Sequence, residues 1–304
     1  MKNLAPVLIF AYRRTDHLRN TLESLARCEG YKASPIIIYC DGPADEEDVA
    51  AVNETRQLLK QFFADEAEYH FSDENLGLSR SIITGVSNVV ERFGRVIVLE
   101  DDLELSPSFL TFMNNALNKY ENEEKVYQVS GYMYDVTELH KTDSALFVPL
   151  TVSWGWATWK RAWKSFDPNA VGWEKLDTDQ KLRKRFNLGG AYDFATMLSR
   201  QMHGIGDSWA IRWYWSVFKR KGLVLFPPCS LVRNTGFDGS GTHGRGVLKS
   251  FSKAKQTLSS QDISFPDKVS VDEARLEQVS DALWKQNGGW KSKIVDSIRR
   301  LMMQ

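Results

Sequence analysis

The sequence has no excess of charge of either sign. Lysine and arginine together number 39, aspartate and glutamate together also number 39, and the net charge is zero at neutral pH. A protein that attracts nucleic acid usually carries a basic field, so this balance argues against a nucleic acid as a partner. The 304 residues are enough for one large α/β domain, or two closely joined ones, with a substantial core.

Cysteine is scarce as well. The three cysteines, Cys28, Cys40 and Cys229, are odd in number and far apart in the sequence. This spacing fits neither a disulfide framework nor a zinc site built from closely paired cysteines, and it favours a reducing compartment.

Long apolar runs are also missing. No stretch is long enough to span a bilayer, and the apolar run at residues 7–10 meets two arginines too soon to be the core of a signal peptide. We therefore expect a cytoplasmic protein. A peripheral contact with the inner face of the membrane is an alternative, because residues 290–301 place an apolar stripe beside basic residues. The same stripe equally fits an ordinary helix docked on the protein.

The first half of the chain alternates short aliphatic runs with amphipathic stretches. The aliphatic runs predict strands at Val7–Ala11, Ile36–Tyr39, Glu68–Phe71 and Arg95–Leu99. Apolar residues at helical spacing predict helices between them, after Thr15 and over residues 48–63 and 76–93. Repeated β-α-β units of this kind predict a mostly parallel sheet flanked by helices, and hence an α/β fold.

The second half is less regular and rich in aromatic residues. Eight of the ten tryptophans lie between Trp154 and Trp215. Helices are predicted over residues 193–202 and 207–219, and a short strand over 223–226. Residues 234–246 contain five glycines, which predicts a flexible loop.

Polar residues follow three of the predicted strands. They are Tyr12-Arg13, Asp41 and the acidic triplet Glu100-Asp101-Asp102. Ligands bind beyond the carboxyl ends of parallel strands, so we expect these groups to converge. Arginine pairs with phosphate, and adjacent carboxylates hold a hard cation that substrate phosphates complete, so the set predicts a nucleoside diphosphate site. Taken singly, the triplet also fits a solvated loop, Asp41 a turn and Arg13 a surface charge.

Several segments together resemble a known family. They are Ala11-Tyr12-Arg13-Arg14, the strand ending at Asp41, Asn75-Leu76-Gly77-Leu78, Val98-Leu99-Glu100-Asp101-Asp102-Leu103 and Ser153-Trp154-Gly155-Trp156. These are similar to GT-A-fold glycosyltransferases, and more closely to the inverting N-acetylglucosaminyltransferase I family and related bacterial sugar transferases. In that family a Glu-Asp-Asp motif binds the metal and a Trp-Gly-Trp-like segment follows. The resemblance implies a GT-A (Rossmann-like), mostly parallel sheet flanked by helices, with a less regular, aromatic-rich acceptor half.

The resemblance also implies roles for individual residues. Nucleotide-sugar binding is implied for Ala11, Tyr12, Arg13, Asp41, Arg80, Glu100 and Asp101. Asp102 would bind Mn²⁺ or Mg²⁺ directly. Independently of the resemblance, His243 in the glycine-rich loop is a candidate to donate to phosphate or to complete the metal site. The simpler interpretations are an exposed helix arginine for Arg80 and an exposed loop histidine for His243.

A catalytic base is implied at Asp207. An inverting transferase needs a carboxylate that removes the proton of the acceptor hydroxyl, and Gly206-Asp207-Ser208-Trp209 matches the family segment that provides it. The alternative is that Asp207 only caps the helix that follows. Trp154 and Trp209 are predicted to line the acceptor groove, although tryptophans at helical spacing are usually core.

We therefore expect a metal-dependent inverting glycosyltransferase. It would move a sugar from a nucleotide-diphosphate donor, expected to be UDP-linked, to a hydroxyl of a glycan or lipid-linked glycan such as a bacterial surface polysaccharide. Residues 1–130 would bind the nucleotide sugar, 131–257 would bind the acceptor and carry catalysis, and 258–304 would form a C-terminal helical tail. A sugar nucleotidyltransferase and a non-catalytic carbohydrate-binding protein are the alternatives, but no glycine-rich phosphate loop follows the first strand.

Overall fold

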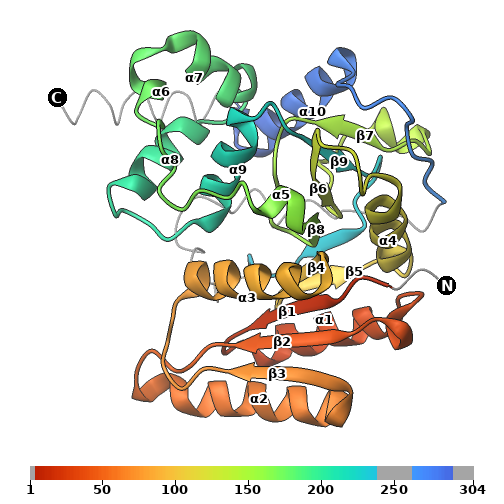
Figure 1. Cartoon of the computed structure of the whole chain (residues 1–304), viewed down its shortest axis with the longest axis vertical. Helices are drawn as coiled ribbons and strands as arrows, with labels where there is room; N and C mark the ends of the chain where they lie inside the picture. The colour runs from red at the N-terminus through yellow and green to blue at the C-terminus, as the bar shows by residue number, and fades with distance from the viewer. Residues whose placement is uncertain (1–3, 238–261, 290–304) are drawn as a thin grey trace.

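An eight-stranded sheet runs through both halves of the chain. In this computed structural model, which describes residues 4–237 and 262–289, the strand order is β3-β2-β1-β4-β8-β6-β9-β7 (Figure 1). Only β8 and β7 run against the other strands of this sheet. The predicted α/β class, with a mostly parallel sheet flanked by helices, is confirmed.

The first half forms one side of the sheet. Its strands are β1 (Val7–Ala11), β2 (Ile36–Cys40), β3 (Ala67–Phe71) and β4 (Arg95–Glu100). Its helices are α1 (Thr15–Ala26), α2 (Val49–Phe63) and α3 (Leu78–Phe93), with short 3-10 turns η1 (Tyr31–Ala33), η2 (Glu46–Asp48) and η3 (Ala64–Glu66). β1 is buried along its whole length, whereas β3 is half-buried because it lies at the edge of the sheet.

The connections in this half place helices on both faces of the sheet. The chain moves outward from β1 to β2 to β3 and then returns to β4 beside β1. Right-handed crossovers in opposite directions put α1 and α2 on one face and α3 on the other (Figure 1). Gly85 of α3 lies against the rings of Phe10 and Tyr39, where an added Cβ would be 2.7 Å from the Phe10 ring. The absence of a side chain at Gly85 lets α3 approach the sheet closely.

The second half extends the sheet and covers it. Its strands are β6 (Val126–Ser130), β7 (Leu146–Val148), β8 (Trp156–Trp159) and β9 (Leu223–Phe226), while β5 (Leu103–Leu105) and β10 (Val232–Asn234) form a separate antiparallel ribbon. Its helices are α4 (Phe109–Lys119), α5 (Lys160–Trp163), α6 (Lys175–Thr178), α7 (Gln180–Phe186), α8 (Phe194–Met202), α9 (Trp209–Lys219) and α10 (Glu273–Gln286), with the turns η4 (Leu139–Lys141) and η5 (Leu188–Gly190).

Tryptophans form the centre of the second core. The rings of Trp156 and Trp209 stack with centroids 5.1 Å apart, and Trp163 lies 5.1 Å from Trp213. All four are at most 5% exposed. Large aromatic side chains bury much apolar surface each, so this cluster joins β8 to α5 and α9.

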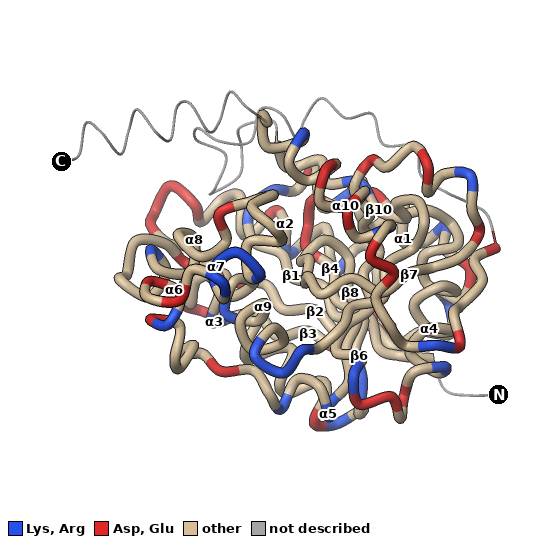
Figure 2. The backbone as a smooth tube through the Cα atoms, turned by 90° about the horizontal axis from the view of Figure 1, so that it is seen from above, with Lys and Arg blue, Asp and Glu red and all other residues tan. Residues whose placement is uncertain are grey.

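Charge is spread over the surface without a dominant sign. In the view of Figure 2, acidic and basic segments are interspersed, and the densest basic stretch is the short helix α7. This agrees with the balanced composition. Among the helices described, none is long and apolar enough to cross a membrane. The predicted stripe at residues 290–301 lies outside the described residues.

Candidate active site

The strand order reverses between β1 and β4. These strands pair in parallel with Phe10 opposite Glu100, so the residues that follow them leave the sheet at the same edge. Ligands of open α/β sheets bind in the crevice at such a reversal. Ala11 and Tyr12 therefore lie beside the acidic triplet, and the predicted convergence of these strand ends is observed.

The acidic triplet concentrates negative charge where little water reaches it. Asp101 and Asp102 are 5% and 8% exposed, and Glu100 is half-buried. Burial, together with repulsion from Asp102 and Asp101, raises the pKa of Glu100 to about 8. Burial also raises the pKa of Asp101. The Glu100 carboxylate accepts no hydrogen bond from any residue that the structure describes.

Arg14 is the arginine at the centre of this edge. Its Nη2 donates to Asp101 Oδ1 and, at 2.8 Å, to Asp102 Oδ2. Burial opposes the charge on Arg14, but the two carboxylates outweigh that effect and raise the pKa of the guanidinium. The sequence prediction assigned the phosphate-binding role to the neighbouring Arg13. The tandem of two arginines after β1 was the available signal, but a strand end alone does not tell which of two adjacent side chains turns toward β4.

Arg13 and Tyr12 turn to a different partner. Both donate hydrogen bonds to Asp48, the last residue before α2. These two hydrogen bonds lower the pKa of Asp48, while burial and the bond to Asp48 raise the pKa of Tyr12 to about 12. The side chain of Arg13 keeps 45% of its surface exposed, so its nucleotide-binding role stays a prediction.

The chemistry of the triplet fits a hard divalent cation. Three crowded carboxylates provide oxygen ligands and more negative charge than Arg14 alone neutralises. Yet within residues 4–237 and 262–289 no three His, Cys, Asp or Glu side chains are arranged to hold a metal ion. Arg14 instead contacts oxygens of both Asp101 and Asp102, so a cation would have to share or replace this contact. His243, the second predicted ligand, lies outside the described residues.

The segment after β10 closes onto Asp102. The Thr235 amide donates to the Asp102 backbone carbonyl at 2.8 Å, and the Thr235 hydroxyl lies 3.1 Å from His17 Nδ1. At Gly236 an added Cβ would be 2.2 Å from Asp102 Oδ2, so only glycine permits this approach. The start of the predicted flexible loop at 234–246 therefore touches the triplet, and the rest of that loop, from residue 238, lies outside the described residues.

Asp41 is held by backbone amides. Its carboxylate accepts hydrogen bonds from Gly42 N, Leu76 N and Gly77 N at 3.0, 2.8 and 2.9 Å. α3 begins at Leu78 and not at Leu76 as predicted, because the backbone of Gly77 (φ 78°, ψ 152°) is not helical. Arg56 adds a hydrogen bond to the Asp41 carbonyl at 3.2 Å. Asp41 thus holds the turn before α3 in place. Its predicted contact with a base or ribose would use the remaining lone pairs of the carboxylate.

Asp207, from the second half of the chain, contacts the same turn and the start of α3. Its Oδ2 accepts from Ser79 N at 3.3 Å and lies 3.6 Å from the position of a Cβ at Gly77. Asp207 is exposed, and the N-cap of α9 is Ser208, whose hydroxyl accepts from Ile211 N. The alternative that Asp207 is merely the cap of α9 is therefore wrong. Arg80, in the first turn of α3, is exposed, and its binding role stays a prediction.

The two predicted acceptor tryptophans lie in different surroundings. Trp154 is half-buried and lines a cavity of about 190 Å³ in the second half. Trp209 is 3% exposed and stacks on Trp156 inside the core. An acceptor could not reach the ring of Trp209, because the ring is packed in the core, as tryptophans at helical spacing usually are.

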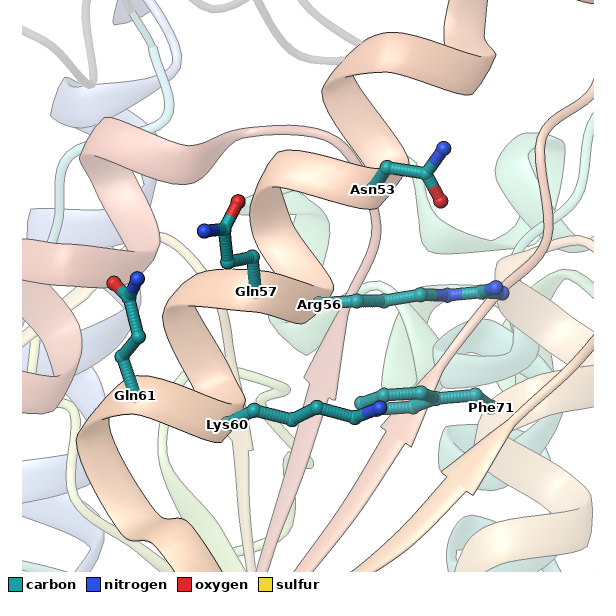
Figure 3. Close-up of a pocket in the computed structure, with 6 residues that line it drawn as sticks. All are labelled: Asn53, Arg56, Gln57, Lys60, Gln61 and Phe71. Carbon is teal, nitrogen blue, oxygen red and sulfur yellow. The ribbon is translucent and has the colours of Figure 1, made fainter.

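A larger groove lies along α2. It has a volume of about 610 Å³ and is bounded by side chains of α2 and by Phe71 on the edge strand (Figure 3). Its lining includes Arg56 and Lys60, both placed over the Phe71 ring, but no carboxylate. The groove lacks the groups that could hold a cation or remove a proton, so we do not regard it as the active site.

Comparison with known proteins agrees with the resemblance seen in the sequence. The Arabidopsis thaliana alpha-1,3-mannosyl-glycoprotein 2-beta-N-acetylglucosaminyltransferase is 23% identical over 203 residues, covering 62% of this chain and 44% of that protein. The chain thus spans less than half the length of this curated relative. Among solved structures, GalNAc-T7 with UDP, GalNAc and Mn²⁺ is similar over 76% of this chain and 44% of its own, with 12% identity and a TM-score of 0.47. The mannosyltransferase PcManGT from Pyrobaculum calidifontis, in complex with GDP-Man and Mn²⁺, is similar over 52% of this chain and 46% of its own, with 12% identity and a TM-score of 0.36.

A family model also matches more than half of the chain. The model of the GNT-I family matches residues 1–202 of the 304. The matched range includes β1, the acidic triplet after β4 and Trp154, which are the segments on which the resemblance was based. The chain belongs to the GNT-I family.

Proposed function

We propose that the protein is a metal-dependent inverting glycosyltransferase that uses a nucleotide-diphosphate sugar. The carrying observation is the buried acidic triplet at the reversal of strand order, where Arg14 already lies between two of its carboxylates. Membership of the GNT-I family supports the same activity. Residues 1–130 would contribute most of the donor site, and residues 131–257 the acceptor site and the base.

The donor would lie along the edge formed by β1 and β4. Arg13 and Arg80 are accessible cations near this edge for the diphosphate, and Asp41 offers lone pairs to the nucleoside. Asp102 would hold Mn²⁺ or Mg²⁺, with Asp101 and Glu100 beside it. When bound, such a cation would neutralise charge that develops on the leaving diphosphate.

Asp207 would act as the base. It is an exposed carboxylate from the second half that lies 3.6 Å from the position of a Cβ at Gly77, whose amide donates to Asp41. Removal of the acceptor proton at its Oδ atoms lets the hydroxyl attack the anomeric carbon from the face opposite the diphosphate, which inverts that centre. Arg212 lies near enough to Asp207 for their charges to attract each other.

The other two functions are less well supported. A sugar nucleotidyltransferase would need a glycine-rich phosphate loop after β1, whereas the residues there are Tyr12 and Arg13, both tied to Asp48. A non-catalytic carbohydrate-binding protein would not need a buried triplet of carboxylates, because burying charge is costly unless it is used or paired.

Calorimetric titration tests the donor site directly. UDP is titrated into wild type and Asp102→Ala, each with and without Mn²⁺. We expect Mn²⁺ to tighten UDP binding to wild type at least about tenfold, worth about 1.4 kcal/mol, and to leave Asp102→Ala unchanged. Asp65→Ala, an exposed carboxylate in η3, is the control and should behave as wild type. Equal affinity in all of these titrations would rule out a metal-dependent donor site at Asp102.

A further inference from the structure

The second half contains a cavity with an aromatic lining. Its volume is about 190 Å³. Six aromatic residues contribute to its wall: Tyr132, Tyr134, Trp154, Tyr192, Phe194 and Tyr214. Thr151, Ser153 and Asn287 are its polar members other than the tyrosines. Pockets for drug-sized ligands usually measure about 300–1,000 Å³, so this one is sized for a single ring or ring substituent.

One polar group in the wall is the hydroxyl of Tyr134. Tyr134 is 6% exposed, and its hydroxyl makes no hydrogen bond within the described part of the chain. The neighbouring Tyr214 differs, because its hydroxyl donates to the Phe186 carbonyl at 2.8 Å. Burial raises the pKa of Tyr134 well above its usual value, so the hydroxyl stays neutral and able to donate.

The cavity adjoins the proposed active site on two sides. The Trp154 ring lies 5.4 Å from that of Phe237, next to Gly236, which packs against Asp102. On the other side, Ala210 and Ile211 line the cavity from the first turn of α9, which directly follows Asp207. The cavity is therefore connected to the acidic triplet through packed side chains and to Asp207 through the start of α9.

We propose that this cavity is the acceptor subsite and that it selects a pyranose carrying a methyl group. The inference rests on the proposed glycosyltransferase function. A fully hydroxylated ring would leave many of its hydroxyls against aromatic and aliphatic walls, which disfavours it. A methyl group buries well there, and the Tyr134 hydroxyl donates to an oxygen beside it. The methyl belongs either to an acetamido group or to a 6-deoxy carbon.

Binding of three sugars with the same ring tests this preference. Glucose, 6-deoxyglucose and N-acetylglucosamine are titrated into the whole protein without donor and followed by ligand-observed NMR. One extra buried methyl typically changes affinity about 10–200-fold, so we expect one methyl-bearing sugar to bind at least about tenfold more tightly than glucose. Tighter binding of N-acetylglucosamine would identify the methyl as that of an acetamido group, and tighter binding of 6-deoxyglucose would identify it as a 6-deoxy carbon. Equal binding of all three, or preference for glucose, would overturn the proposal.

Variants locate the binding in this cavity. Ala210→Leu fills the space beside α9 and should abolish binding of the preferred sugar, and Tyr134→Phe should weaken it about tenfold while changing the shape of the cavity very little. Tyr69→Phe on β3, which loses a hydroxyl that donates to the Ala64 carbonyl, is the matched control and should bind as wild type. If Ala210→Leu does not fold, Tyr134→Phe alone decides. Unchanged binding in Tyr134→Phe would contradict the proposal.

The same variants separate this inference from the proposed function. UDP binding with Mn²⁺ should be unchanged in Tyr134→Phe, because the residue is not at the donor edge. If sugar binds as described but no donor supports transfer, the function is wrong and the subsite stands. If transfer occurs and Tyr134→Phe does not change the acceptor KM, the subsite is wrong and the function stands.

Discussion

The donor edge and the tryptophan cluster are built on opposite principles. At the donor edge, buried carboxylates are crowded together and only partly neutralised by Arg14, which leaves the pKa of Glu100 raised to about 8. In the tryptophan cluster, Trp156, Trp209 and their neighbours fill space with apolar rings and carry no charge. The first arrangement costs stability because it crowds buried charges, and the second stabilises the fold because it buries apolar surface. Asp207 lies at the junction, two residues before Trp209, the first residue of α9.

The largest effect is expected where the two regions meet. Asp207→Asn keeps the shape of the side chain but removes the base, so transfer should fall about 10²–10⁴-fold. Steady-state transfer rates measure this, and UDP binding should be unchanged. Asp179→Asn is the control, because Asp179 is a true N-cap whose side chain accepts from Leu182 N, and asparagine caps nearly as well. Near wild-type transfer by Asp207→Asn would reduce Asp207 to its structural contact with Ser79.

The charge balance at the donor edge can be tested by replacing Arg14, the side chain that pairs with the acidic triplet. Arg14→Gln leaves Asp101 and Asp102 without a countercharge, and breaking a buried pair of this kind typically costs about 3–5 kcal/mol. Denaturant unfolding measures the loss, and Mn²⁺ should restore more stability to Arg14→Gln than to wild type. The control is Arg92→Gln, which loses an exposed pair with Glu68 and should cost at most about 1 kcal/mol. If Mn²⁺ stabilises Arg14→Gln no more than wild type, the carboxylates are not its ligands.

Substitutions in the tryptophan cluster should lower the free energy of unfolding and leave ligand binding unchanged. Trp209→Ala removes a core ring and should lower the free energy of unfolding by about 3–5 kcal/mol. Trp154→Ala, in the half-buried wall of the cavity, should cost less stability and instead raise the acceptor KM. Thermal unfolding and acceptor kinetics on both variants separate the two roles. An unchanged acceptor KM in Trp154→Ala would remove this residue from the acceptor site.

The smallest effect concerns a carboxylate of the first half that is exposed and well paired. Hydrogen bonds from Arg92 and His70 lower the pKa of Glu68 to about 2, in contrast to the raised pKa of Glu100. A lowered folded-state pKa stabilises the protein above the unfolded value near 4.3 and loses that contribution as the pH falls toward 2. Because the side chain is 38% exposed, the contribution should stay below about 1 kcal/mol. Wild type and Glu68→Gln should therefore converge in stability between about pH 4.3 and 2, as followed by urea unfolding. A constant difference across that range would contradict the pairing.

Local sequence was enough to predict the strands and helices of the first half and the edge of the sheet at which its polar residues gather. Runs such as Val7–Ala11 and Arg95–Leu99 have few alternatives to buried strands, and parallel strands place their carboxyl ends together whatever the side chains do. The positions of α1, α2 and α3 follow from the same alternation. The pattern of residues is therefore sufficient to place the acidic triplet at the edge of the sheet.

Tertiary structure decided which side chains turn toward that edge. Arg13 and Arg14 are adjacent and chemically identical, but Arg13 pairs with Asp48 while Arg14 pairs with the triplet, a choice made by residues 35 or more positions away. Trp154 and Trp209 likewise differ by their packing partners and not by residue type. The α/β sheet and the three carboxylates at its reversal follow from the order of the amino acids, because strand patterns and turns are local. Long-range contacts alone decided that Asp207 meets Ser79 and that Trp209 is core, because those depend on how α9 packs against α3 and β8.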